Sequence, residues 1–131
     1  MEIKKEYYLL FPLAKVYSAW VSSDTVIEPA TSMDINPVVG GHYRLNMELP
    51  DFSSSNEGTF SLVEPERHIR YSWEWNHDGE VTEIDVRFSA ADGATKVEIL
   101  HQGFTKEESV TNHDSGWDSY IAGLTEHLST A

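Results

Sequence analysis

The feature that most constrains this chain is a two-residue hydrophobic period that runs, with interruptions, from residue 42 to residue 102. Apolar and polar residues alternate there in short runs, a pattern typical of β-strands with one buried face. The pairs Asp78-Gly79 and Asp92-Gly93 separate such runs and predict tight hairpins. Because hairpins join antiparallel strands, the sequence predicts an antiparallel sheet with a single apolar face. Another element must cover that face.

One amphipathic helix near the carboxyl end is the expected cover. The stretch HDSGWDSYIAGLTEHL, residues 113–128, carries apolar residues at helical spacing, and the helix is expected to begin near Ser115. These apolar residues are Trp117, Tyr120, Ile121, Leu124 and Leu128. The last three are expected to anchor the helix, and the first two to form one wall of a pocket.

Gly123 interrupts this helix at a cost of about 1 kcal/mol of helix propensity relative to alanine. A close approach of the sheet, or room left for a ligand, would explain a glycine at this position.

The remaining segments complete an α+β arrangement. Residues 2–10 are expected to form a strand, residues 11–20 a helix, and residues 22–30 a second short helix that stops before Pro29. Residues 33–37 predict a short strand, and PDFSSSNEG at residues 50–58 is interpreted as a mobile loop. The sequence thus predicts one domain over residues 1–131: a curved antiparallel β-sheet around a long carboxy-terminal helix, with two short helices after the first strand.

Composition excludes several classes of function. The 22 acidic and 9 basic residues give a formal net charge of -13, which opposes binding to nucleic acid and to anionic membranes. The absence of cysteine excludes disulfides, thiolate catalysis and cysteine metal sites. No apolar run has the length of a signal peptide or a membrane span, so a cytoplasmic location is expected.

Five segments in order carry a resemblance to a known family: VYSAWVSSD, NPVVGGHYRL, EGTFSLVEPERHIRYSWEW, TEIDVRFSAADGATKVEILHQGF and GWDSYIAGLTEHL. Their succession, over residues 3–128, resembles the domain homologous to the activator of heat-shock protein 90 ATPase. That family lies in the START and birch-pollen-allergen-like superfamily of helix-grip folds. The resemblance implies a cavity between sheet and helix that holds a small hydrophobic ligand, lipid-like, aromatic or polyketide-like. It also implies two alternatives: interaction with a chaperone, or cyclase or hydrolase activity on a bound aromatic substrate.

A curved sheet around a single helix leaves space unless large side chains fill it, so both a pocket and an aromatic-filled core remain open. Residues with inward parity or helical phase are the candidates to line the pocket. They are Tyr43, Met47, Tyr71, Trp73, Trp75, Ile84, Val86, Phe88, Ile99, His101, Trp117, Tyr120, Ile121 and Leu124.

Catalytic and metal-binding motifs are missing from the sequence, so no catalytic residue, metal or cofactor is predicted. His101 shares the inward parity of Val97 and Ile99. It can be a histidine satisfied by backbone or solvent, a group that orients a ligand, or an acid or base paired with Tyr71 or Tyr120. Binding is therefore favoured over catalysis.

Overall fold

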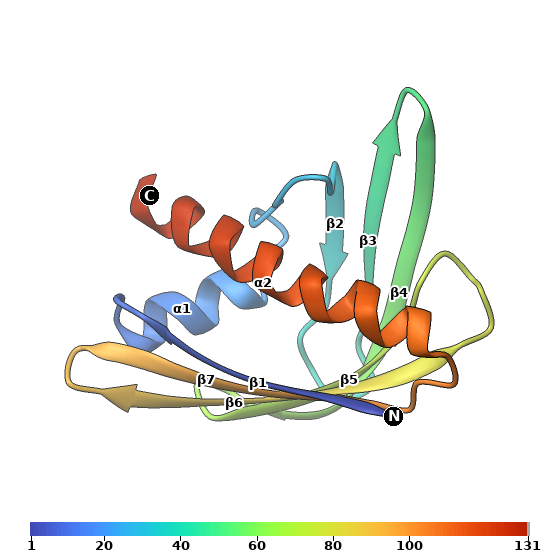
Figure 1. Cartoon of the computed structure of the whole chain (residues 1–131). Coiled ribbons are helices and arrows are strands. Elements are labelled where there is room, and N and C mark those ends of the chain that lie inside the picture. Colours follow the sequence, from blue (N-terminus) through green and yellow to red (C-terminus); the bar gives the residue numbers. More distant parts are fainter. Residues whose placement is uncertain (131) are drawn as a thin grey trace.

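A curved antiparallel sheet with two helices on its concave face makes up the computed structural model, which describes residues 1–130 (Figure 1). The strands in this part of the chain are β1 (Glu2–Leu9), β2 (Ser32–Ile35), β3 (His42–Leu49), β4 (Phe52–Glu64), β5 (His68–Glu74), β6 (Val81–Ala91) and β7 (Ala94–Gln102). The helices are α1 (Leu13–Trp20) and α2 (Glu107–Thr130). The strand order is β1-β7-β6-β5-β4-β3-β2, and every pairing is antiparallel. The predicted fold class is therefore confirmed.

The core lies between the sheet and the carboxy-terminal half of α2. Ile121, Leu124 and Leu128 are buried, which confirms them as the anchors of the helix. α1 fills the space beside them, where Tyr17 and Trp20 pack edge-on against Phe88 of β6.

Helix α2 begins at Glu107, eight residues before the expected start near Ser115. Two acidic residues, Glu107 and Glu108, occupy its first turn, where the helix dipole favours negative charge. Just before the helix, the buried Glu80 carboxylate accepts hydrogen bonds from the backbone N–H and the hydroxyl of Thr105. The bond from the Thr105 hydroxyl is the main cause that lowers the pKa of Glu80, to about 2. Because polar residues form these contacts, the first turns of α2 have no apolar repeat, and the sequence pattern did not predict the start of the helix.

The second short helix predicted at residues 22–30 is wrong. This segment consists of turns, in which the Thr25 N–H bonds the Ser22 carbonyl and the Ala30 N–H bonds the Ile27 carbonyl. Thr25 and Ile27, like Val26 between them, are β-branched, and Pro29 restricts the residue before it to non-helical angles. A stretch this short does not form a helix against such local preferences.

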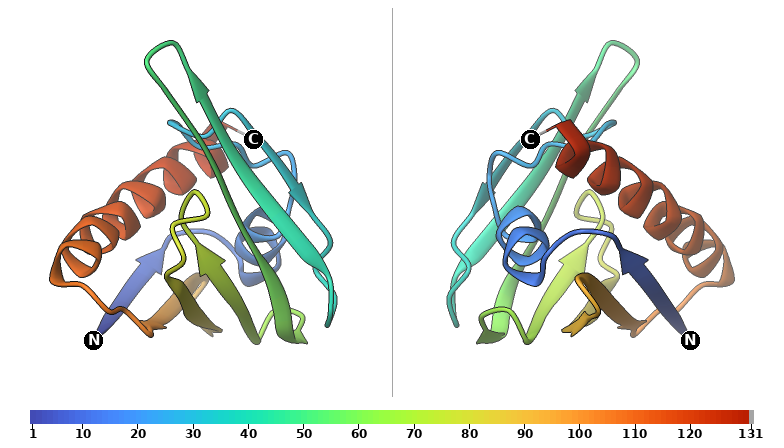
Figure 2. Two further views of the ribbon diagram at one scale, coloured as in Figure 1. Left: turned by 90° about the vertical axis from the view of Figure 1, so that its right-hand side faces the viewer. Right: turned by 90° about the vertical axis from the view of Figure 1, so that its left-hand side faces the viewer.

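The prediction of a mobile loop at residues 50–58 is also wrong. β4 begins at Phe52, which pairs with Leu49, and the β3–β4 hairpin projects beyond the rest of the sheet (Figure 2). Ser54 and Asn56 occupy inward positions of β4 and are buried. The Asn56 side chain is hydrogen-bonded to the Leu45 carbonyl and to the backbone N–H of Asn76. Polar residues thus fill buried strand positions because their hydrogen bonds are satisfied.

The two hairpin predictions have different outcomes. Asp92 and Gly93 both have positive φ in a tight turn between paired Ala91 and Ala94, as predicted. The β5–β6 connection is longer than a two-residue turn, since β5 ends at Glu74 and β6 begins at Val81. Trp75 accordingly lies in this connection and not in a strand.

None of the helices among residues 1–130 is both long enough and apolar enough to cross a membrane.

Gly123 faces Ile27 of the irregular segment and not the sheet. A Cβ atom added at Gly123 would clash with the Cγ2 methyl group of Ile27. The close approach that the sequence suggested is therefore made by the segment that was expected to be a helix.

We predict that Gly123→Ala lowers the free energy of unfolding by about 1–2 kcal/mol, because the overpacking penalty exceeds the gain in helix propensity. In an Ile27→Ala background the same substitution should instead raise it by up to about 1 kcal/mol. Urea unfolding of the four proteins tests this double-mutant cycle. A stabilising Gly123→Ala in the wild-type background would contradict the close contact.

Candidate functional site

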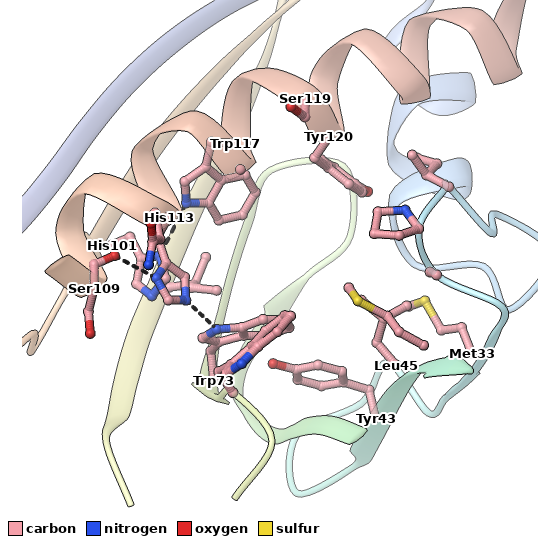
Figure 3. Close-up of a pocket in the computed structure, with 18 of the residues that line it drawn as sticks. Met33, Tyr43, Leu45, Trp73, His101, Ser109, His113, Trp117, Ser119 and Tyr120 are labelled. Atoms are coloured by element: carbon pink, nitrogen blue, oxygen red, sulfur yellow. Dashed lines mark hydrogen bonds between the residues drawn. The ribbon is translucent and has the colours of Figure 1, made fainter. Parts of the chain in front are cut away.

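A cavity of about 750 Å³ lies between the sheet and the amino-terminal half of α2 (Figure 3). Its floor is formed by inward residues of β3 to β7, and its roof by α2. The irregular segment after α1 closes one end with Ile27, Pro29 and Ala30. Aromatic side chains dominate the lining, and Met33 and Met47 add flexible apolar surface from β2 and β3.

Nine of the fourteen candidate residues line this cavity. They are Tyr43, Met47, Tyr71, Trp73, Trp75, Ile84, His101, Trp117 and Tyr120. Their contact with a ligand stays a prediction.

The other five candidates lie outside the cavity, in the core. They are Val86, Phe88, Ile99, Ile121 and Leu124. The sequence periodicity predicted which face of each strand or helix these side chains occupy. It did not predict whether they lie at the cavity end or the core end of that element. α1 covers the sheet at Phe88, as its contacts with Tyr17 and Trp20 show, so this end of the sheet is filled by the protein itself.

Sequence reasoning missed several lining residues. Met33, Phe52 and the segment around Ile27 were assigned to other roles, and Ser109, Asn112 and His113 lie before the expected helix start near Ser115. Gly116 lies within the expected helix but was not named as a lining residue. Continuing the helix backward from Tyr120 in steps of three and four residues reaches Trp117, Gly116 and His113. That periodicity was the available signal.

His113 connects α2 to the sheet. Its Nδ1 lies 2.7 Å from the Ser109 carbonyl oxygen, which can only accept, so the proton is on Nδ1. Its Nε2 therefore accepts the hydrogen bond from the indole N–H of Trp73 in β5, at 2.9 Å. The imidazole is thus neutral and both of its nitrogens are hydrogen-bonded.

His101, buried at the end of β7, makes the second connection. Its Nδ1 accepts from the indole N–H of Trp117 at 3.1 Å, so Nε2 carries the proton and donates to the Thr82 hydroxyl at 2.7 Å. The Thr82 hydroxyl in turn donates to the Trp73 carbonyl oxygen at 3.1 Å. Burial, with a smaller contribution from His113, lowers the pKa of His101 to about 3.

These hydrogen bonds form a connected set that limits acid–base chemistry in the cavity. We call it the Trp–His network, which consists of Trp73, Thr82, His101, His113 and Trp117. A general base needs a free lone pair, yet each imidazole acceptor nitrogen already receives an indole N–H. Among residues 1–130, no cluster of three histidine, aspartate or glutamate side chains has the geometry to hold a metal ion. The arrangement is suited to holding an apolar molecule rather than to transferring protons.

We predict that stability falls faster on acidification in the wild type than in His101→Gln, whose side chain does not titrate. Because the pKa of folded His101 is lowered from 6.5 to about 3, the unfolded chain gains a proton below pH 6.5 that the folded chain does not. Stability linked to this group is thus complete above pH 6.5 and is lost as the pH falls from there toward 3.

Between pH 7 and pH 5 the wild type should lose about 1–2 kcal/mol more than the variant. Urea unfolding monitored by tryptophan fluorescence at each pH measures the difference. Parallel pH profiles for the two proteins would show that folded His101 titrates normally.

The comparisons with known proteins agree with this architecture. A family model described as activator of Hsp90 ATPase homolog 1-like protein matches residues 10–129. No match was found among proteins with curated descriptions.

Solved structures show the same fold at low sequence identity. A protein from Chromobacterium violaceum has 16% identity and a TM-score of 0.84, over 97% of this chain and 96% of that one. An AHSA1-like protein from Aeromonas hydrophila has 22% identity and a TM-score of 0.81, over 99% of this chain and 93% of that one. Ara h 8.0201 has 13% identity and a TM-score of 0.82, over 100% and 99% of the two chains. The chain belongs to the activator of Hsp90 ATPase homolog 1-like family.

Proposed function

We propose that this chain is a cytoplasmic binding protein that holds a small, largely apolar molecule between its sheet and α2. The observation that carries the proposal is the cavity of about 750 Å³. This volume lies in the range of about 300–1,000 Å³ that is usual for small-molecule sites.

The chemistry of the wall supports an apolar ligand. The indole N–H groups of Trp73 and Trp117 and the nitrogens of both histidines are hydrogen-bonded to one another or to the protein. These side chains therefore present ring faces and edges to the cavity without unsatisfied polar atoms. Removing apolar ligand surface from water against such a wall is favourable by about 25 cal/mol per Å².

The catalytic alternative receives less support from the same geometry. His101 was the one candidate acid or base from the sequence, paired with Tyr71 or Tyr120. Its lone pair accepts from Trp117, and burial lowers its pKa to about 3, so it would be a weak base near neutral pH.

The family description supports a second candidate function, the activation of a chaperone ATPase. In that case the outer surface of the protein would carry the activity. A substitution that fills the cavity would then leave unchanged the ATPase rate of a chaperone mixed with this protein. The same substitution would abolish a function that depends on a bound ligand.

Gly116 offers a direct test of the binding proposal. It lines the cavity from α2, and a Cβ atom added there meets no protein atom within 4 Å. Gly116→Phe can therefore occupy ligand space without a clash at Cβ, and it also improves helix propensity by a few tenths of a kcal/mol.

We expect the neutral fluorescent probe N-phenyl-1-naphthylamine to bind the wild type saturably at one site, and Gly116→Phe to weaken that binding by roughly tenfold or more. Ala122→Phe is the matched control, because Ala122 is an exposed residue of α2 that does not line the cavity. Equal probe affinity in all three proteins would place the binding outside the cavity and contradict the proposal.

A further inference from the structure

We propose that the ligand is an uncharged molecule with a hydrogen-bond acceptor, such as a ketone oxygen, that accepts from the hydroxyl groups of Tyr71 and Tyr120. This inference rests on the proposed binding function and specifies the chemical class of the ligand. It follows from which polar groups of the cavity are already paired and which are not.

Tyr120 supplies the first free donor. Its side chain extends from α2 into the cavity, with the hydroxyl at its inner end (Figure 3). The ring is held by Trp20 and Trp117, whose centroids lie 5.1 and 5.9 Å away. Within residues 1–130, the Tyr120 hydroxyl makes no hydrogen bond, although the aromatic packing fixes the position of the ring.

Tyr71 supplies the second donor from β5. Its hydroxyl oxygen accepts from the indole N–H of Trp20 at 3.3 Å, which orients the group but does not use its proton. No acceptor for that proton is present among residues 1–130. Burial raises the pKa of both Tyr71 and Tyr120, so both phenols remain protonated and able to donate. Tyr71 raises the pKa of Tyr120 further, by a smaller amount than burial does.

Tyr43 and the Trp–His network offer a ligand no free donor. The Tyr43 hydroxyl donates to the Ser72 carbonyl oxygen, and the Trp–His network satisfies its own nitrogens. A ligand acceptor beside these groups would therefore take its hydrogen bonds from the hydroxyl protons of Tyr71 and Tyr120. A ligand that covers a hydroxyl without accepting its proton leaves that hydroxyl unpaired at a cost, so an acceptor that reaches both phenols gains more than an apolar group in the same place.

The charges around the cavity exclude a carboxylate as that acceptor. Glu28, Asp78 and Glu108 contribute negative charge to the lining, and Lys106 is its one lysine or arginine within residues 1–130. All four are exposed, and the deep wall has no cationic group, because His101 is neutral. Burial of an ionised ligand without a countercharge is strongly unfavourable. An uncharged acceptor matches the phenol donors and avoids the unfavourable burial of a charge.

Three ligands of nearly identical shape separate the effect of the hydrogen-bond acceptor from the effect of ligand charge. 2-Acetylnaphthalene has a ketone oxygen, 2-isopropenylnaphthalene replaces that oxygen by a methylene group, and 2-naphthoate replaces the acetyl group by a carboxylate. Their dissociation constants are measured by equilibrium dialysis at pH 7 with the wild type, Tyr120→Phe, Tyr71→Phe and Tyr17→Phe. Tyr17→Phe is the matched control, since Tyr17 of α1 is buried outside the cavity lining.

We expect the ratio of ketone affinity to alkene affinity to fall about fivefold in Tyr120→Phe and in Tyr71→Phe, the usual effect of one lost hydrogen bond, and to stay unchanged in Tyr17→Phe. Comparing ratios cancels the difference in hydrophobicity between the two ligands. 2-Naphthoate should bind the wild type at least about tenfold more weakly than the ketone.

An unchanged ratio in both cavity variants, or naphthoate binding as tight as ketone binding, would overturn this inference while leaving the binding function intact. Failure of both neutral ligands to bind the wild type would overturn the binding function itself, and this inference with it.

Discussion

The Trp–His network is the interaction on which the architecture of the site depends. It joins β5, β6 and β7 to the first three turns of α2 through hydrogen bonds between neutral groups. Each imidazole accepts a hydrogen bond from an indole N–H and donates one to an oxygen atom. All four imidazole nitrogens are therefore hydrogen-bonded within the protein, without solvent. The amino-terminal half of α2 is thus fixed by polar contacts to strands β5, β6 and β7, and the space beside it stays open.

The two halves of α2 therefore differ in how they meet the sheet. Beyond Tyr120 the helix is anchored by Ile121, Leu124 and Leu128 in a core without room for a ligand. Before Tyr120 it is held by His113 and Trp117, and small or polar residues face the cavity. The hydroxyls of Tyr71 and Tyr120, neither of which donates to the protein within residues 1–130, lie where these two regions meet, which gives the cavity an apolar body and one polar end.

The sequence predicted the sheet, the Asp92-Gly93 turn and the helix anchors because each depends on local periodicity or turn chemistry. It did not predict the start of α2, since Glu80 and Thr105 define that end through a contact 25 residues apart in sequence. Parity likewise identified Phe88 and Tyr71 as inward residues but could not tell that α1 covers the first and leaves the second at the cavity. His113 was missed because its helical spacing from Trp117 was its one signal among polar neighbours, and its role comes from Trp73 across the fold.

The protonation states of the two histidines test this account most directly. The ¹⁵N chemical shifts of the imidazole nitrogens at pH 7 distinguish imidazolium from the two neutral tautomers. The account predicts that His101 is neutral with its proton on Nε2 and that His113 is neutral with its proton on Nδ1. An imidazolium at either position, or the opposite tautomer, would contradict the network that holds α2 above the cavity.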